Sequence, residues 1–223
     1  MTLTRYGLKQ WLLITVNLAI PFAFFMWFGW WIGVGVVFVL WAALVSFFRN
    51  PWRRIPTGLE EGTMLSPADG TISAVERVDH HEAIGSEALI IRVFLSVLDV
   101  HINRVPCDCT LREMIYKPGK FLDARTEEST RVNESNLLIL ENHGEPFGVR
   151  QVSGKIARRI VCPVQVGDTF LQGQQFGMIK YGSTTELILP RPDDVEVKVK
   201  RGDKVKAGLT VFCVLHTLTR GSF

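Results

Sequence analysis

Residues 167–173 read GDTFLQG, and residues 202–208 repeat the same form as GDKVKAG. In both stretches a Gly-Asp pair is followed, two positions later, by an apolar residue and then by a second glycine. Glycine adopts the backbone angles that tight turns require, and an aspartate side chain stabilises such turns. Each stretch therefore predicts a turn, a short strand and a second turn, and the pair favours a β core without indicating any chemistry.

Short strand patterns continue through most of the chain after residue 63. Residues 71–75 alternate apolar and polar positions, and residues 88–95 form a nearly continuous apolar run typical of a buried strand. Further strands are expected at residues 112–116, 137–140 and 148–152, and residues 155–162 fit a strand or a helix. Residues 123–136 are expected to form a polar loop. We therefore expect a mainly β domain over residues 57–223, which resembles the barrel-sandwich arrangement of lipoyl-type domains.

The N-terminal segment has the composition of a membrane anchor. No charged residue occurs from Trp11 to Phe48, and this run is too long for one simple span because about 20 apolar residues cross a bilayer. Gly29 interrupts the run near its middle. Both flanks are basic, with Arg5 and Lys9 before the run and Arg49, Arg53 and Arg54 after it, where arginines suit anionic lipid headgroups. This pattern predicts an α-helical hairpin with both ends on the cytoplasmic side. Residues 1–56 are thus expected to be a hydrophobic membrane hairpin with a basic junction, holding the β-rich domain on the cytoplasmic side of the cell membrane.

Two alternatives exist for this anchor. One is a single long tilted span, and the other is a cleaved signal peptide. The run is longer than the apolar region of a signal peptide, and no small-x-small cleavage site precedes a polar start. We therefore favour an anchor over a signal peptide, and a hairpin over a single span.

Composition argues against several other classes of protein. The formal net charge is only +3, and no arginine-rich run or nucleic-acid-binding module is present, so no nucleic-acid partner is expected. Four cysteines occur, Cys107, Cys109, Cys162 and Cys213, without the second pair or the flanking histidines of a zinc site. They are expected to be reduced thiols, and no metal site is predicted.

Three residues offer the groups that activate a hydroxyl. Ser183 follows a glycine in the stretch KYGST, Asp69 lies in the glycine-bounded turn SPADG, and His101 lies in DVHINR. A serine, a carboxylate and an imidazole can together generate a nucleophile. Each residue alone also has an ordinary explanation, as a turn residue or as a buried structural histidine.

Seven stretches taken together resemble the phosphatidylserine decarboxylase family, in order and at plausible spacing, from about residue 47 to residue 212. They are FRNP (48–51), SPADG (66–70), FLSVLDVHINR (94–104), YKPGKF (116–121), NESN (133–136), GKIARRI (154–160) and GQQFGMIKYGS (173–183). The chain looks closest to the short, archaeal-type branch of that family.

The resemblance implies a proenzyme that cuts itself between Gly182 and Ser183. The Ser183 hydroxyl would attack the Gly182 carbonyl, and the ester would eliminate to dehydroalanine, which hydrolyses to a pyruvoyl group and ammonia. The products would be a β chain of residues 1–182 and an α chain of residues 183–223. The pyruvoyl group derived from Ser183 would be the covalent cofactor on the α chain.

The resemblance further implies a carboxy-lyase of phospholipid biosynthesis. Phosphatidylserine in an anionic membrane would form a Schiff base with the pyruvoyl group and leave as phosphatidylethanolamine. His101 is expected to reprotonate the α-carbon, and Asp69 to orient and stabilise the imidazole during self-cleavage. The candidates for binding the substrate phosphate are Lys120, Arg104, Arg158 and Arg159.

One departure from the family pattern leaves a question open. Longer bacterial members carry a second histidine three positions after the first, where this chain has Arg104. Either His101 serves both self-cleavage and decarboxylation, or another residue takes one of these roles. Whether the chain forms a homo-oligomer is also open.

Two other functions remain as alternatives. The first is a membrane-tethered barrel-sandwich carrier or binding module without decarboxylase activity, which would be modified on Lys180. The second is a relative of the decarboxylases that has lost self-cleavage and serves as a scaffold.

Overall fold

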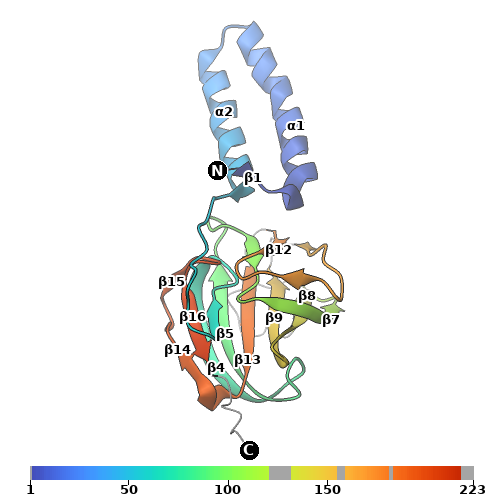
Figure 1. Ribbon diagram of the computed structural model, residues 1–223. Coiled ribbons are helices and arrows are strands. Elements are labelled where there is room, and N and C mark those ends of the chain that lie inside the picture. The colour runs from blue at the N-terminus through green and yellow to red at the C-terminus, as the bar shows by residue number, and fades with distance from the viewer. Residues whose placement is uncertain (1, 121–131, 155–158, 181–182, 217–223) are drawn as a thin grey trace, which may run out of the picture. The chain divides into compact units, whose positions relative to one another are not determined.

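The computed structural model describes residues 2–120, 132–154, 159–180 and 183–216 of the 223-residue chain. The chain divides into two compact units, Met1–Trp52 and Arg53–Phe223 (Figure 1).

The first unit is a hairpin of two apolar helices. α1 (Leu8–Trp27) and α2 (Trp31–Ser46) are joined at Gly29, which has a φ of 66° that glycine adopts readily. Trp41 Nε1 of α2 donates a 3.1 Å hydrogen bond to Thr15 Oγ1 of α1. The stretch Arg5–Trp27 is long and apolar enough to cross a membrane, whereas α2 is shorter. The predicted helical hairpin with its turn near Gly29 is therefore confirmed.

The two ends of the hairpin are tied together. A 3-10 turn (η1, Arg5–Gly7) precedes α1, and β1 (Thr2–Leu3) pairs antiparallel with β2 (Arg49–Asn50). Gly7 lies so close to the Phe48 ring that a Cβ atom would be 2.1 Å from its Cδ1. The chain therefore enters and leaves this unit at the same end.

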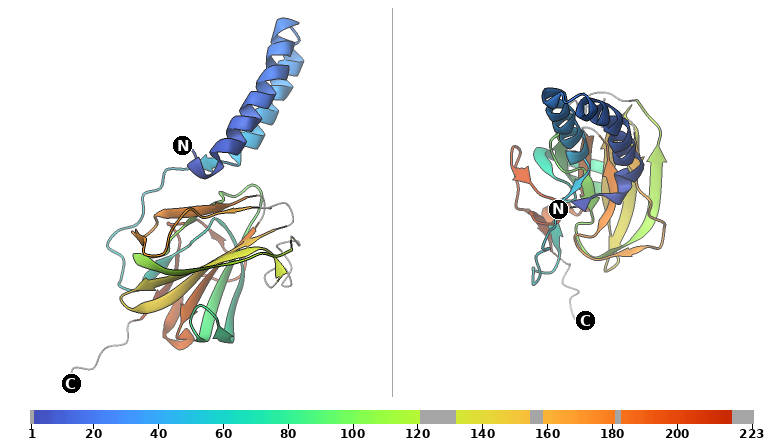
Figure 2. Two further views of the ribbon diagram at one scale, coloured as in Figure 1. Left: turned by 90° about the vertical axis from the view of Figure 1, so that its right-hand side faces the viewer. Right: turned by 90° about the horizontal axis from the view of Figure 1, so that it is seen from above.

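The second unit is mainly β, as predicted (Figures 1 and 2). Its largest sheet has eight strands in the order β11-β7-β8-β9-β13-β5-β4-β15. Their bounds are β4 Gly70–His81, β5 Ser86–Leu95, β7 Cys109–Lys117, β8 Ser135–Asn142, β9 Glu145–Ser153, β11 Thr169–Phe170, β13 Ser183–Pro190 and β15 Lys204–Val205. In the described part of the chain this sheet is open, with β11 and β15 at its edges, and does not close into a barrel.

Two three-stranded sheets, β10-β12-β6 and β14-β16-β3, complete this unit. Their bounds are β3 Thr63–Leu65, β6 Ile102–Arg104, β10 Ile160–Val161, β12 Gln175–Ile179, β14 Val195–Val197 and β16 Val211–Leu215, and a 3-10 turn (η2, Pro192–Asp194) precedes β14.

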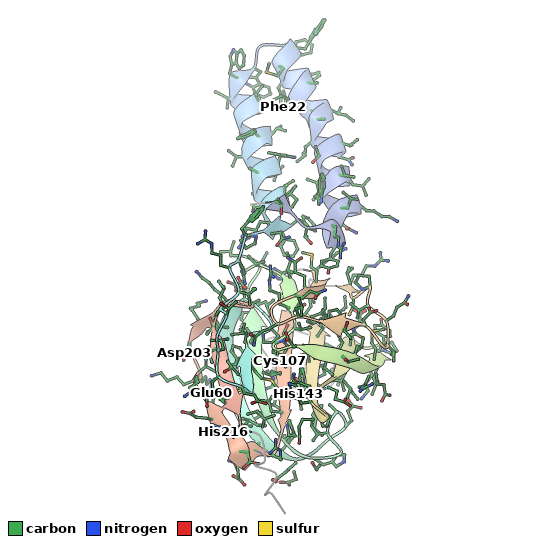
Figure 3. The ribbon with its side chains drawn as sticks, in the orientation of Figure 1. Phe22, Glu60, Cys107, His143, Asp203 and His216 are labelled. Atoms are coloured by element: carbon green, nitrogen blue, oxygen red, sulfur yellow. The ribbon has the colours of Figure 1, made fainter. Side chains whose placement is uncertain are left out.

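The repeated Gly-Asp stretches form the two edge strands of the large sheet. The Asp168 carboxylate accepts a 2.8 Å hydrogen bond from the Gln165 amide, and the Asp203 carboxylate, labelled in Figure 3, accepts an equivalent 2.9 Å bond from the Lys200 amide. All four glycines of the repeat have positive φ angles, between 70° and 98°. The repeat is thus a fold signal, as its sequence indicates, and each copy caps one end of the sheet.

β13 lies inside the large sheet and is buried on both faces. Leu187 and Leu189 point into the main apolar core, and Ile188 belongs to a smaller cluster on the opposite face. On that second face the fully buried Glu186 accepts hydrogen bonds from Arg92 at 2.7 Å and from Arg150 at 2.6 Å. The sheet therefore holds an apolar core on one side and a buried charge cluster on the other.

Candidate active site

Ser183 is the first residue of β13 and is completely buried. It pairs with Leu95 of β5 on one side and with Ser153 of β9 on the other. The Ser153 amide donates to the Glu134 carbonyl at 2.9 Å, so the backbone groups of Ser153 point away from β13. Ser153 and Ser183 are thus a non-hydrogen-bonded pair, the kind in which facing side chains lie closest. Ser183 Oγ has no hydrogen-bond partner among the described residues.

A chain of buried amide and hydroxyl side chains lies next to Ser183. Thr185 is on the same face of β13 as Ser183, because strand side chains alternate. Asn103 of β6 donates to Thr185 Oγ1 at 3.0 Å and accepts from Gln151 Nε2 of β9 at 2.9 Å. Asn136 of β8 donates to Gln151 Oε1 at 3.2 Å. These contacts fasten β6 onto the Ser183 face of the large sheet.

His101 immediately precedes β6 and is completely buried. It is two residues from Asn103, so strand alternation places its side chain on the side that faces the large sheet. Its carbonyl accepts from the Ile179 amide at 3.2 Å, and Ile179 ends β12 four positions before Ser183. The structure therefore brings His101 to the chain segment that leads into Ser183.

The hydrogen bond of the His101 ring defines its tautomer. Nδ1 lies 2.9 Å from the Asp99 carbonyl oxygen, which can only accept. Nδ1 therefore carries the proton, and Nε2 is the basic nitrogen of the neutral ring. Such a ring takes up or releases a proton at Nε2 without losing its contact with Asp99.

Asp69 is held in a buried ion pair. Its two carboxylate oxygens lie 2.7 and 2.6 Å from the two terminal nitrogens of Arg53, and Oδ1 also accepts from the Ala207 amide at 2.8 Å. The Arg53 guanidinium donates to the Ala207 carbonyl as well. Only 5% of the Arg53 side chain and 11% of the Asp69 side chain are exposed. Arg53, which sequence reasoning assigned to the lipid junction, is thus the cation that fixes Asp69.

The segment that carries Asp69 is packed against β6. The Pro67 carbonyl accepts from the Arg104 amide at 3.0 Å and from Asn103 Nδ2 at 3.4 Å. The turn with Asp69 and the strand that follows His101 are therefore neighbours.

The candidate phosphate-binding cations lie in different environments. Lys120 and Arg159 are exposed, whereas Arg104 is buried and donates to the Gly173 carbonyl at 2.7 Å. Arg158 and Gly182 are outside the described residues.

Lys180, three positions before Ser183, is also buried, with 5% of its surface exposed. Burial, and secondly the charge of Arg159, lower the pKa of its amine. A lysine that receives a carrier group must be accessible at a hairpin tip, so the burial of Lys180 counts against the carrier alternative.

A polar pocket lies away from this region. Glu60, Cys107 and His143, labelled in Figure 3, contribute to its lining. His143 is in the turn between β8 and β9, whereas Ser153 is at the opposite end of β9. The pocket is therefore separate from the Ser183 site.

A family model described as phosphatidylserine decarboxylase matches residues 40–213. The chain belongs to the phosphatidylserine decarboxylase family. A phosphatidylserine decarboxylase proenzyme from Rhodopirellula baltica is 42% identical over 212 residues, which is 93% of this chain and 86% of that protein. Proteins of the same name from Carboxydothermus hydrogenoformans and Symbiobacterium thermophilum are 42% identical over 181 residues and 46% identical over 178 residues. They cover 81% and 78% of this chain, and 83% and 78% of their own lengths.

Membership of the phosphatidylserine decarboxylase family confirms the family resemblance inferred from the sequence. The match includes Asp69, His101 and Ser183. Sequence reasoning did not single out Asn103, Gln151 or the other members of the buried polar chain. The signal that could have revealed them is the presence of amide and hydroxyl side chains at strand positions whose side chains are buried.

The Arg53–Asp69 pair yields a stability prediction. Removing one partner leaves the other charge buried, so Arg53→Ala and Asp69→Ala are each expected to lower the free energy of unfolding by about 3–5 kcal/mol. The double variant is expected to lose less than the sum, because neither charge is then left alone. Urea unfolding followed by far-ultraviolet circular dichroism measures all three.

Arg54→Ala is the matched control, because Arg54 is the exposed neighbour of Arg53. It is expected to change stability by less than about 0.5 kcal/mol. Small, additive losses in the single and double variants would show that the pair does not hold this turn.

Proposed function

We propose that this chain is a proenzyme that cuts itself between Gly182 and Ser183 and then converts phosphatidylserine to phosphatidylethanolamine. The observation that carries the proposal is the environment of Ser183. In a chain of this family, Ser183 begins a central strand, is fully buried, and has a hydroxyl with no partner among the described residues. His101 and the polar chain around Asn103 lie on the same side of the sheet.

Self-cleavage begins when the Ser183 oxygen bonds to the Gly182 carbonyl carbon and the amide C–N bond breaks, giving an ester and a free amine. Elimination of the Gly182 carboxylate from the Ser183 side chain leaves dehydroalanine. One water molecule hydrolyses its imine tautomer to a pyruvoyl group and ammonia. The products are a β chain, residues 1–182, and an α chain, residues 183–223.

The surroundings of Ser183 suit a small uncharged keto group. The position is closed to solvent, and the hydroxyl of its cross-strand neighbour Ser153 also has no partner among the described residues, so it can donate to a new carbonyl oxygen. When formed, the pyruvoyl group supplies a carbonyl that takes the substrate amine and accepts the electron pair left by departing CO₂.

The protein's own groups would handle protons and charge. With Nδ1 held by the Asp99 carbonyl, His101 Nε2 is the atom that would deliver a proton to the substrate α-carbon. Asp69, in the turn packed against β6, would stabilise the charged imidazole during self-cleavage. The exposed cations Lys120 and Arg159 are better placed to reach a lipid phosphate than Arg104, whose guanidinium is committed to the Gly173 carbonyl.

The helical hairpin would anchor the enzyme in the cell membrane with the second unit on the cytoplasmic side. The length and composition of Arg5–Trp27 support a membrane location. Basic residues on both sides of the hairpin, among them Lys9 and Arg49, support the orientation. Holding the site at a membrane raises the local concentration of a lipid substrate.

Ser183→Ala is expected to remain one uncut chain without decarboxylase activity, because alanine has no hydroxyl to form the ester. Intact mass of the purified protein is the measurement. The unaltered chain should give two species split between residues 182 and 183, the smaller one carrying a pyruvoyl group in place of serine. An uncut Ser183→Ala protein with full activity would refute the proposed function.

His101→Gln is expected to lower turnover by about 10²–10⁴-fold, the usual contribution of general acid catalysis. Release of CO₂ from phosphatidylserine in mixed micelles is measured on the cut fraction, which intact mass determines first. His143→Asn is the control, because His143 lies at the far end of β9 and has a φ of 48°, which asparagine tolerates. Unchanged turnover in cut His101→Gln protein would exclude His101 as the proton donor.

Membrane orientation is tested with sealed vesicles prepared in both orientations from cells that make the full chain. Protease added outside is expected to degrade the second unit only where the cytoplasmic face is outward. Alkaline carbonate should leave the chain in the membrane pellet. Extraction of the whole chain by carbonate, or degradation in the opposite vesicles, would contradict the proposed anchor or its orientation.

A further inference from the structure

Three buried oxygens without hydrogen-bond partners among the described residues lie in one row across the large sheet. They are Glu134 Oε2, Ser153 Oγ and Ser183 Oγ. Ser183 pairs directly with Ser153. The β8–β9 register pairs Ser135 with Val152, so its continuation sets Glu134 opposite Ser153, in agreement with the 2.9 Å bond from the Ser153 amide to the Glu134 carbonyl.

The three side chains also share a face of the sheet. Ser153 alternates with Gln151, which belongs to the polar chain on the Ser183 face. Glu134 is two residues from Asn136, another member of that chain, and its Oε1 accepts a 2.8 Å bond from the hydroxyl of Tyr116, the β7 partner of Asn136. The row therefore runs carboxylate, hydroxyl, hydroxyl on neighbouring strands.

Such an arrangement is costly unless it serves a purpose. A buried polar atom left without a partner destabilises a fold, because its lost hydrogen bonds to water are not replaced. Glu134 is 8% exposed, and Ser153 and Ser183 are completely buried. Among the described residues, the only other buried side-chain atoms of this kind are two nitrogens of Arg191. The clustering of three in one row at the predicted cleavage position points to chemistry in that row.

We propose that Ser153 and Glu134 take up the hydroxyl proton of Ser183 during self-cleavage, an inference that rests on the proposed function. When side-chain rotation brings the three oxygens within hydrogen-bond distance of one another, the Ser183 proton passes to Ser153 Oγ while the Ser153 proton passes to Glu134 Oε2. The Ser183 oxygen at the same time forms its bond to the Gly182 carbonyl carbon. When the C–N bond breaks, the leaving nitrogen takes a proton back through the same row, so Glu134 ends as a carboxylate and no proton is lost.

Tyr116 would orient the acceptor. Its hydroxyl occupies Oε1 of Glu134 and leaves Oε2 for Ser153. The hydrogen bond to Glu134 raises the pKa of Tyr116, so the phenol keeps its own proton and remains a donor.

Longer family members carry a second histidine that this chain lacks, and the row suggests which groups replace it. At that position Arg104 donates to the Gly173 carbonyl, and an arginine does not act as a base. With the Ser153–Glu134 row taking up the Ser183 proton, His101 is not needed as the base for that step and can act as the proton donor in decarboxylation.

The test follows the rate of cutting in freshly made full-length precursor by intact mass. Ser153→Ala and Glu134→Gln are each expected to slow the cut by about 10²-fold or more. Ser73→Ala is the matched control, because Ser73 donates to the Arg92 carbonyl at 3.3 Å on another strand, and it should cut at the normal rate. Thermal unfolding verifies that each variant is folded.

Two further readouts separate proton transfer from a structural role. The unaltered chain should cut more slowly in D₂O, by a factor that is smaller in Ser153→Ala because one transferred proton is gone. The uncut Ser153→Ala precursor should resist neutral hydroxylamine, which cleaves esters and not amides.

Three results would each overturn the role of this row and leave the proposed function standing. They are folded variants that cut at the normal rate, an isotope effect in Ser153→Ala equal to that of the unaltered chain, and cleavage of the stalled Ser153→Ala precursor by hydroxylamine. An unaltered chain that never cuts would instead overturn the proposed function itself.

Discussion

The pairing of β13 on both sides is the constraint on which the site depends. Because strand side chains alternate, a shift of this strand by one position would move Ser183 to the opposite face of the sheet. Glu186 opposes such a shift. It is fully buried and bound by Arg92 and Arg150 from the two neighbouring strands, and a slip would carry its charge into the apolar core. The ion pairs on one face thus maintain the register that presents the serine on the other.

Local signals in the sequence predicted most of the elements, and the family resemblance supplied the candidate site residues. The Gly-Asp repeat predicts turns and short strands because glycine and aspartate act on adjacent backbone, and both copies lie at the sheet edges. The charge-free run with a central Gly29 predicts a helical hairpin by the same local reasoning. Ser183 and His101 became candidates through the family stretches that contain them, and the structure brings their segments together.

Contacts between distant strands were beyond such reasoning. Residues 123–136 read as a polar loop, and this was wrong at its end, because Ser135 and Asn136 begin β8, where pairing with β7 and β9 overrides their polar character. The contacts of Ser153 and Arg53 could not be predicted for the same reason. A serine in a strand and an arginine beside an apolar segment are ordinary until the fold shows which buried group each one faces.

The position of β13 also determines how the two fragments of a chain cut before Ser183 would be held together. Residues 183–223 supply this interior strand of the large sheet, its edge strand β15, and β16 at the centre of a three-stranded sheet. Strands from residues 1–182 pair with β13 on both of its sides. They also pair with one side of β15 and with one side of β16. The two pieces of a cut molecule would be interlaced, so neither could depart without dismantling the sheets of the other. The lifetime of the two-chain enzyme would equal that of the fold, and fragments would not be exchanged between molecules.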